Sequence, residues 1–268
     1  MEMFNLFKAF LFKIRKDLTF RITMFIGLGL AVIMSLIYLG IDNLSGSKEL
    51  CTGQNMLISS LSPAQNFGIA IPVNLISFTV LEFTQGTIRN KIIAGNSKLK
   101  IYVSLFFSGL VFTLVILAAY AGISFGLGSI FGGFDPNGMV LAGIFPGLSS
   151  PEYILKTILL TVIVYTTITS ITIFFATTFR SIGPCIPVVI IFIMIAYFSS
   201  FIISNVNPEA EQIVRYINPL HALVAISNEG GVISYPDDRF ITGIIVNVVY
   251  IAIFFTGGLV LFRTRDVK

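Results

Sequence analysis

Residues 101–134 read IYVSLFFSGLVFTLVILAAYAGISFGLGSIFGGF and contain no Asp, Glu, Lys, Arg or His. A helix of this length, rising about 1.5 Å per residue, exceeds the thickness of a membrane's hydrocarbon layer, which is about 30 Å. Five other long stretches also lack these residues, and they are 22–41, 50–81, 157–179, 181–208 and 240–262. The pattern predicts an all-α membrane protein with six transmembrane helices.

The composition agrees with this fold class. Of the 268 residues, 55% are hydrophobic and only 11% are charged, whereas about 25% are charged in an average soluble domain. The gaps between the apolar stretches are short, so we expect residues 1–268 to form a single transmembrane domain. The predicted spans are 22–41, 63–81, 101–128, 157–179, 185–204 and 240–262.

Basic residues alternate between the gaps. Both terminal segments and two of the gaps hold most of the 17 Lys and Arg residues, and the alternate gaps hold only Lys48, Lys156, Arg215 and Arg239. Basic residues favour the cytoplasmic side of a membrane. We therefore expect a multi-pass protein of the plasma membrane with both termini in the cytoplasm. The basic excess reflects topology, so we expect no nucleic-acid partner.

Residues 1–20 have the pattern of an amphipathic helix lying in the cytoplasmic interface. Apolar residues recur at three- and four-residue steps and share one face, and they are Phe4, Phe7, Leu11, Ile14 and Leu18. We expect that face to enter the acyl chains, while basic residues lie among the lipid phosphates. These basic residues are Lys8, Lys13, Arg15 and Lys16. The alternative is an ordinary basic lead-in to the first span.

Proline, asparagine and glycine mark the predicted helix ends. Pro72 is expected to kink the second span. The outer gap 205–239 contains two helix starts, Asn207-Pro208-Glu209 and Asn218-Pro219-Leu220, in which Asn caps the helix and Pro fills its first turn. An extracellular helical hairpin should therefore precede the last span. Glycines are expected to end the third span at the outer edge, and they are Gly126, Gly128, Gly132 and Gly133.

The sequence contains no catalytic or metal-binding motif that we can identify. The dipeptide Gly-Lys does not occur, so there is no phosphate-binding P-loop. The only histidine, His221, is expected to be a surface residue in the first turn of an outer helix. Cys51 and Cys185 do not have the spacing of metal ligands. We expect no enzyme activity, no metal site and no cofactor in this chain.

The predicted spans contain neutral polar residues in place of charged ones. Proton- or ion-coupled carriers usually need ionisable groups near the middle of the membrane, so a transporter of this kind would need an external energy source. The candidates for lining a substrate path are Asn74, Ser77, Tyr197 and Ser200. The alternative is that such residues form hydrogen bonds within or between helices, each worth about 1 kcal/mol.

The cytoplasmic segment after the second span reads LEFTQGTIRNK at 81–91. Residues 87–94 predict a short amphipathic helix whose apolar side chains face the bundle or a partner, namely Ile88, Ile92 and Ile93. The side chains expected to face water are Arg89, Asn90 and Lys91. A short basic hairpin of this kind suits insertion into a groove of a cytosolic protein. The alternative is a solvated loop that orients the chain by its charge.

In this segment Glu82 stands at the membrane boundary, four residues before Gly86-Thr87. Together with the six spans, the inner termini, the N-terminal amphipathic helix and the outer Asn-Pro helices, the pattern resembles the ABC-2 family of exporter permeases. The resemblance implies a set of residues that couple the chain to an ATPase, namely Glu82, Gly86, Thr87, Arg89, Asn90, Lys91 and Lys98. It also implies a second permease chain, identical or related, and two cytosolic ATPase subunits that bind ATP and Mg.

The small six-span form is similar to peptide-exporting and lantibiotic-immunity permeases. By this resemblance the chain would be the transmembrane permease subunit of an ATP-driven ABC exporter. It would move an amphipathic or lipid-like substrate, such as an antimicrobial peptide, by alternating access. Two other functions stay open: a stand-alone passive channel or ion-coupled carrier, and a non-transporting membrane anchor or immunity protein.

Overall fold

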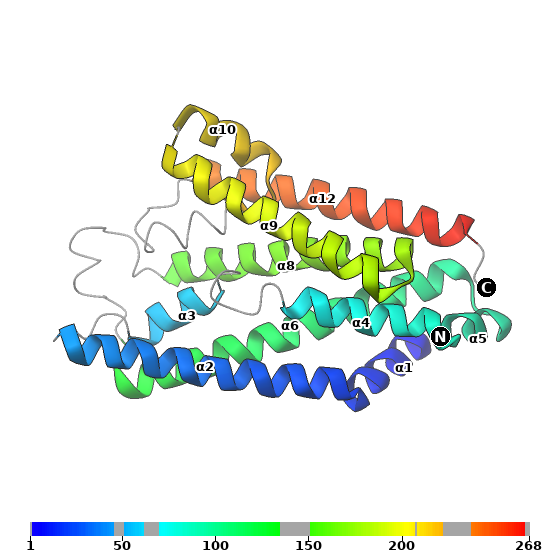
Figure 1. Cartoon of the computed structure of the whole chain (residues 1–268), viewed down its shortest axis with the longest axis horizontal. Coiled ribbons are helices and arrows are strands. Elements are labelled where there is room, and N and C mark those ends of the chain that lie inside the picture. The colour runs from blue at the N-terminus through cyan, green and yellow to red at the C-terminus, as the bar shows by residue number, and fades with distance from the viewer. Residues whose placement is uncertain are drawn as a thin grey trace.

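The computed structural model describes residues 2–45, 51–61, 70–134, 151–206, 208–221 and 237–265, and every regular element in these ranges is an α-helix (Figure 1). The helices are α1 (Glu2–Lys16), α2 (Leu18–Ser45), α3 (Gly53–Leu61), α4 (Ala70–Thr84), α5 (Thr87–Ile93), α6 (Lys98–Phe131), α8 (Pro151–Phe179), α9 (Ile182–Val206), α10 (Pro208–Ile217) and α12 (Asp237–Thr264). The predicted all-α fold class is confirmed for this part of the chain.

Five of these helices are long and apolar enough to cross a membrane. They cover Leu18–Leu44, Lys98–Phe131, Leu155–Phe179, Ile182–Ser200 and Phe240–Thr264. Five of the six predicted spans largely coincide with them, because a long charge-free run leaves the chain few alternatives to a helix that satisfies its own backbone hydrogen bonds. The chain therefore has the helices of a multi-pass membrane protein.

The second predicted span, 63–81, differs from the structure. The helix in this region, α4, begins at Ala70 and has 15 residues, so it is about 22 Å long and shorter than the hydrocarbon layer. Pro72 lies in the first turn of α4 and not in the middle of a span. A proline there costs no helical hydrogen bond, since its N–H would have no helical partner, so the reason for the expected kink is gone. The shorter helix α3 precedes α4 in the chain, and residues 62–69 lie outside the described ranges.

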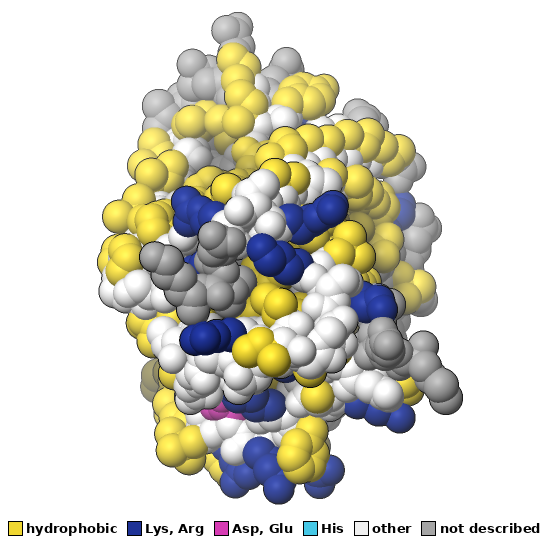
Figure 2. Space-filling view, turned by 90° about the vertical axis from the view of Figure 1, so that its right-hand side faces the viewer, with side chains coloured by type: hydrophobic (Ala, Val, Ile, Leu, Met, Phe, Trp, Pro, Cys, Tyr) yellow, Lys and Arg dark blue, Asp and Glu magenta, His cyan; other side chains and the backbone are white. Residues whose placement is uncertain are grey.

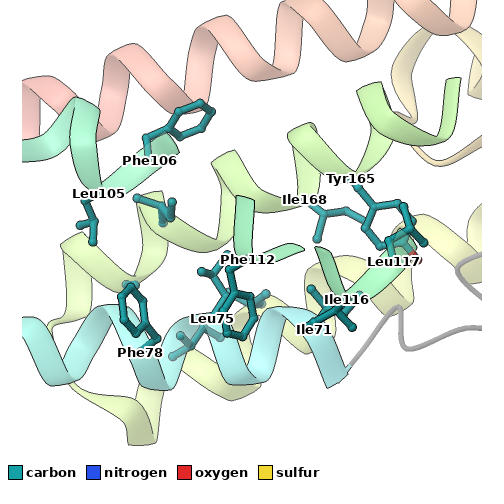
Figure 3. Close-up of a cluster of buried hydrophobic side chains, with 14 of the residues drawn as sticks. Ile71, Leu75, Phe78, Leu105, Phe106, Phe112, Ile116, Leu117, Tyr165 and Ile168 are labelled. Atoms are coloured by element: carbon teal, nitrogen blue, oxygen red, sulfur yellow. The ribbon is translucent and has the colours of Figure 1, made fainter. Parts of the chain in front are cut away.

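Helices α6 and α8 form the centre of the bundle. In the apolar windows of these two helices 61% of the residues are buried, whereas in those of α2, α9 and α12 only 17% are. Helix α8 packs against α12, α4, α6 and α9, and helix α6 packs against α1, α2 and α3. Figure 3 shows α4, α6 and α8 contributing side chains to one buried cluster, including Ile71, Leu75, Phe78, Leu105, Phe112, Ile116, Tyr165 and Ile168.

Gly128 of α6 and Gly132, which caps this helix, allow α3 and the residues just before it to lie directly against α6. A Cβ atom on Gly128 would stand 2.7 Å from Met56 Cγ, and one on Gly132 would collide with the Cys51 carbonyl. Helix α6 ends at Phe131, with Gly133 at φ 79°. The expected break at the glycines is therefore correct in kind, but the helix runs beyond the predicted boundary at 128.

The segment between α9 and α12 is described in part. Helix α10 starts at Pro208 as predicted. Asn218 begins a turn by accepting a hydrogen bond from Leu220 N at 2.9 Å on its Oδ1. The expected second helix of the hairpin falls mostly in 222–236, outside the described residues. The prediction that His221 lies on the surface is wrong, because the turn carries it into the bundle and only 3% of it is exposed.

Candidate functional site

The segment between α4 and α6 folds as a short helix held between two sharp turns. Gly86 has φ 67° and Gly95 has φ 86°, a left-handed conformation that glycine adopts without steric cost. Helix α5 occupies Thr87–Ile93, close to the predicted range of 87–94. Helix α6 then begins at Lys98 and is capped by Ser97, whose hydroxyl accepts a hydrogen bond from Lys100 N at 3.4 Å. The segment is therefore an ordered helical hairpin, not a solvated loop.

A buried carboxylate joins the base of this hairpin to the first helix of the chain. The side chain of Glu82, on α4, is fully buried. Its Oε1 atom lies 2.6 Å from Lys13 Nζ on α1, and its Oε2 atom lies 3.0 Å from Lys91 Nζ on α5. A buried charge is tolerated only when it is paired. Glu82 therefore fastens α1, α4 and α5 at one point.

Lys91 is enclosed by this cluster. Its Nζ lies 3.2 Å from the centroid of the Phe10 ring, and its side chain is 15% exposed. Burial lowers the pKa of the Lys91 ammonium, the Glu82 carboxylate opposes that shift, and the charge of Lys13 adds to it. The prediction that Lys91 faces water is wrong, because the carboxylate and the aromatic ring draw it inward.

The other side chains of α5 divide into an inner and an outer set. Ile88 is fully buried and Ile92 is half-buried, so both face the bundle as one of the predicted alternatives has it. Arg89 and Asn90 are exposed, as expected, and Ile93 is 72% exposed. The outer surface of α5 thus combines a cation, an amide and an apolar side chain. Gly86 and Thr87, at the start of the helix, are half-buried.

Lys98 fastens a different pair of elements. Its Nζ donates to the carbonyl oxygens of Arg263 at 2.9 Å and Arg265 at 3.1 Å, at the C-terminal end of α12. Arg265 Nη1 in turn donates to Thr178 O at 2.7 Å, at the end of α8. Both cations satisfy helix-end carbonyls that have no partner within their own helix. Figure 2 shows dark blue basic side chains spread over this end of the molecule.

Helix α1 does not use its main apolar face to enter lipid. The buried stripe consists of Leu6, Phe10 and Ile14. Phe7 and Leu11 are half-buried, whereas Phe4 and Leu18 are exposed. The prediction that this apolar side enters the acyl chains is therefore wrong in part, because α1 packs on α6. Lys13 pairs with Glu82 and donates to Gln85 Oε1 at 3.2 Å, so it does not lie among lipid phosphates. Phe10 was missed, although its four-residue spacing from Ile14 was a readable signal.

Two of the four residues proposed for a substrate path bond to the backbone of their own helix. Asn74 Nδ2 donates to Ala70 O at 2.8 Å and Ser77 Oγ donates to Val73 O at 3.1 Å, both within α4. Tyr197 is half-buried on α9.

Ser200 is buried and belongs to a polar cluster beside the turn that follows α10. Its Oγ accepts a hydrogen bond from Asn218 Nδ2 at 2.8 Å. Nearby, Asn247 Nδ2 donates to Pro219 O at 2.9 Å, and Asn247 Oδ1 accepts from Thr167 Oγ1 at 2.7 Å. These bonds tie the turn after α10 to α8, α9 and α12. For Ser200, the bond to Asn218 agrees with the alternative that the polar residues of the spans form hydrogen bonds between elements. Asn218 was not singled out for this role, although its place before a proline marks it as a turn residue.

No group of three or more His, Cys, Asp and Glu side chains lies close enough to hold a metal ion within the described ranges. Comparison with curated proteins and with solved structures gives no match. A family model described as a protein of unknown function (DUF2705) matches residues 31–268, so the chain belongs to this family.

Proposed function

We propose that the chain is the transmembrane permease subunit of an ATP-driven ABC exporter. Its sequence resemblance to ABC-2 permeases supports this function, and the hairpin built on α5 is the observation on which the proposal rests most. That hairpin is ordered, is fixed to the bundle at its base by Glu82, and presents Arg89, Asn90 and Ile93 outward. It has the features needed to fit a groove of a cytosolic ATPase.

The ion pairs give a route by which force on α5 reaches the bundle. Displacement of α5 moves Lys91, which is paired with Glu82 on α4. The same carboxylate is paired with Lys13, so α1 moves with it. Helix α4 packs against α8 and α9, and α1 packs against α6. A push on the outer surface of α5 is therefore passed to the central helices and rearranges the bundle between inward- and outward-facing states.

The remaining parts of the proposal follow from the resemblance. Two cytosolic ATPase subunits bind ATP and Mg, and a second permease chain completes the path. The cargo is amphipathic or lipid-like, such as an antimicrobial peptide, and passes between the two permease chains near Asn74, Ser77, Tyr197 and Ser200. Six spans, with α3 and α4 together forming a broken second one, leave both termini in the cytoplasm at the plasma membrane.

Copurification tests the proposal. The tagged chain, expressed at its natural level in its own host, should retain a P-loop ATPase that mass spectrometry identifies. Arg89→Glu should reduce the retained ATPase at least tenfold, because it reverses the charge on the outer surface of α5. Arg263→Glu is the matched control, since it reverses an exposed charge on the same end of the molecule but on α12. A wild-type chain that retains no ATPase, as a stand-alone channel or carrier predicts, contradicts the proposal. Equal effects of the two reversals also contradict it.

A further inference from the structure

The outward side of α1 interleaves aromatic rings with cations. Phe4 is 59% exposed and Phe12 is 61% exposed. Lys8 Nζ lies 4.5 Å from the centroid of the Phe4 ring, and Lys16 Nζ lies 4.6 Å from that of Phe12. Exposed phenylalanine is unfavourable in water, and an ammonium group is unfavourable among acyl chains. Only the boundary between headgroups and acyl chains suits both at once.

The bend between α1 and α2 gathers three cations. Arg21 Nε donates to Arg15 O at 3.4 Å, and Arg21 Nη2 donates to Lys16 O at 3.5 Å. The guanidinium of Arg21 therefore lies at the end of α1, and the side chains of Arg15 and Lys16 are exposed there. The carboxylate at this bend, Asp17, accepts hydrogen bonds from Thr19 N at 2.7 Å and from Phe20 N at 3.4 Å, so it caps α2.

An apolar surface starts immediately beyond the bend. On the first turns of α2, Leu18 is 70% exposed, Ile22 is 48% exposed and Phe25 is 74% exposed. Because α2 is long and apolar enough to cross a membrane, these side chains lie at the depth where acyl chains begin. Figure 1 shows the bend between α1 and α2 at the edge of the bundle. The three cations thus stand at the level of the lipid headgroups.

We propose that this bend binds the headgroup of an anionic phospholipid, with Arg15, Lys16 and Arg21 around the phosphate. Phe12 and Leu18 lie against the acyl chains of the same lipid. A zwitterionic headgroup satisfies the apolar contacts equally well, but it leaves the net positive charge of the bend, three cations against the Asp17 carboxylate, uncompensated. The site therefore selects net negative charge. The bound lipid holds α1 against the bundle, where Lys13 reaches Glu82. This inference depends on the membrane and on α1, and it does not require an ATPase partner.

The absence of tryptophan from the sequence makes the test direct. Phe12→Trp places a single fluorescent reporter in the full-length chain, which is reconstituted in phosphatidylcholine nanodiscs. A fixed fraction of the lipid is then dibrominated phosphatidylglycerol in one sample and dibrominated phosphatidylcholine in the other, and bromine quenches only nearby reporters. Quenching should show at least about a fivefold preference for phosphatidylglycerol at position 12, because a surface cation adds about that factor to anionic-lipid affinity. Phe198→Trp, 51% exposed on α9, is the control and should show a ratio of about one.

Two further measurements separate a headgroup site from other causes. Neutralising the bend by Arg15→Gln, Lys16→Gln and Arg21→Gln should bring the ratio at position 12 to about one, and Lys16→Gln alone should lower it partly. Raising the salt concentration should also lower the ratio in the unmutated bend, since screening weakens exposed charges. Equal ratios at positions 12 and 198 overturn the proposal, as does a preference that survives neutralisation and salt. Absence of quenching by both lipids at position 12 also overturns it, because protein would then cover this surface.

Discussion

Removal of the Glu82 carboxylate should destabilise the bundle strongly. Glu82→Leu leaves Lys91, which is 15% exposed, and Lys13, which is 33% exposed, without the charge that they share. Removal of one partner from a buried ion pair costs about 3–5 kcal/mol. Because Lys13 is partly exposed and can turn toward water, we expect the lower end of that range, about 3 kcal/mol.

The two free cysteines provide an assay for this prediction. Cys51 is 1% exposed and Cys185 is 0% exposed, so a thiol-reactive fluorescent dye labels them only when the protein unfolds. On the scale of domains of about 150–250 residues, a loss of 3 kcal/mol lowers the unfolding midpoint by about 6–12 °C. The control Arg89→Leu removes an exposed cation from α5 and should change the free energy of unfolding by no more than about 0.5 kcal/mol.

A triple variant distinguishes the charge from the shape of the site. Replacing the whole cluster by Lys13→Met, Glu82→Leu and Lys91→Met removes the uncompensated charges, and such replacements are often neutral or stabilising. The triple variant should therefore melt close to the wild type. If Glu82→Leu melts with the wild type, or if the triple variant melts as low as the single one, the ion pairs do not hold these helices together.

Three further experiments test the packing and the electrostatics. Gly128→Ala should lower the free energy of unfolding by about 1–3 kcal/mol, because the added methyl group overpacks the contact with α3. Gly126→Ala, with open space around its Cβ, should not lower it. Gly258→Ala should be destabilising because its Cβ collides with the Tyr102 hydroxyl, and Tyr102→Phe should rescue it in the double variant. Since burial lowers the pKa of Lys91 in the folded state, the unfolded chain binds more protons. Wild-type stability, followed by circular dichroism, should thus rise relative to Lys91→Gln as pH approaches the ordinary lysine value of 10.5.

Hydropathy predicted the long helices well, because a long charge-free segment in lipid can satisfy its backbone hydrogen bonds within itself only as a helix. It failed in the stretch 50–81, where the structure has two short helices, α3 and α4, in place of one long helix. The stretch 50–81 is uniformly apolar or neutral, so nothing in its charge pattern separates α3 from α4. The close approach of α3 to Gly128 is a tertiary contact, and glycine spacing alone occurs too often by chance to predict it.

The segment between α4 and α6 was predictable as a helix, but the contacts of its side chains were not. Local sequence placed α5, because the apolar residues of 87–94 recur on one face of a helix. The inward turn of Lys91 depends on Glu82 and on Phe10, far away in the sequence. A surface cation and a buried, paired cation look alike in one sequence, so the water-facing assignment of Lys91 was wrong.

Some basic residues around α5 hold helices together, whereas others are exposed. An experiment on partner binding must distinguish these two groups. Lys91 holds Glu82, and Lys98 holds the last carbonyls of α12, so substitution of either changes the bundle as well as its surface. Arg89 is exposed on the outer side of α5. A count of positive charges treats Lys91, Lys98 and Arg89 alike. Only their contacts in the structure distinguish the two that hold helices from the one that is exposed. If Lys91→Glu loses the copurifying ATPase, a damaged fold explains the loss. If Arg89→Glu loses it while the melting point is unchanged, the outer surface of α5 contacts the partner.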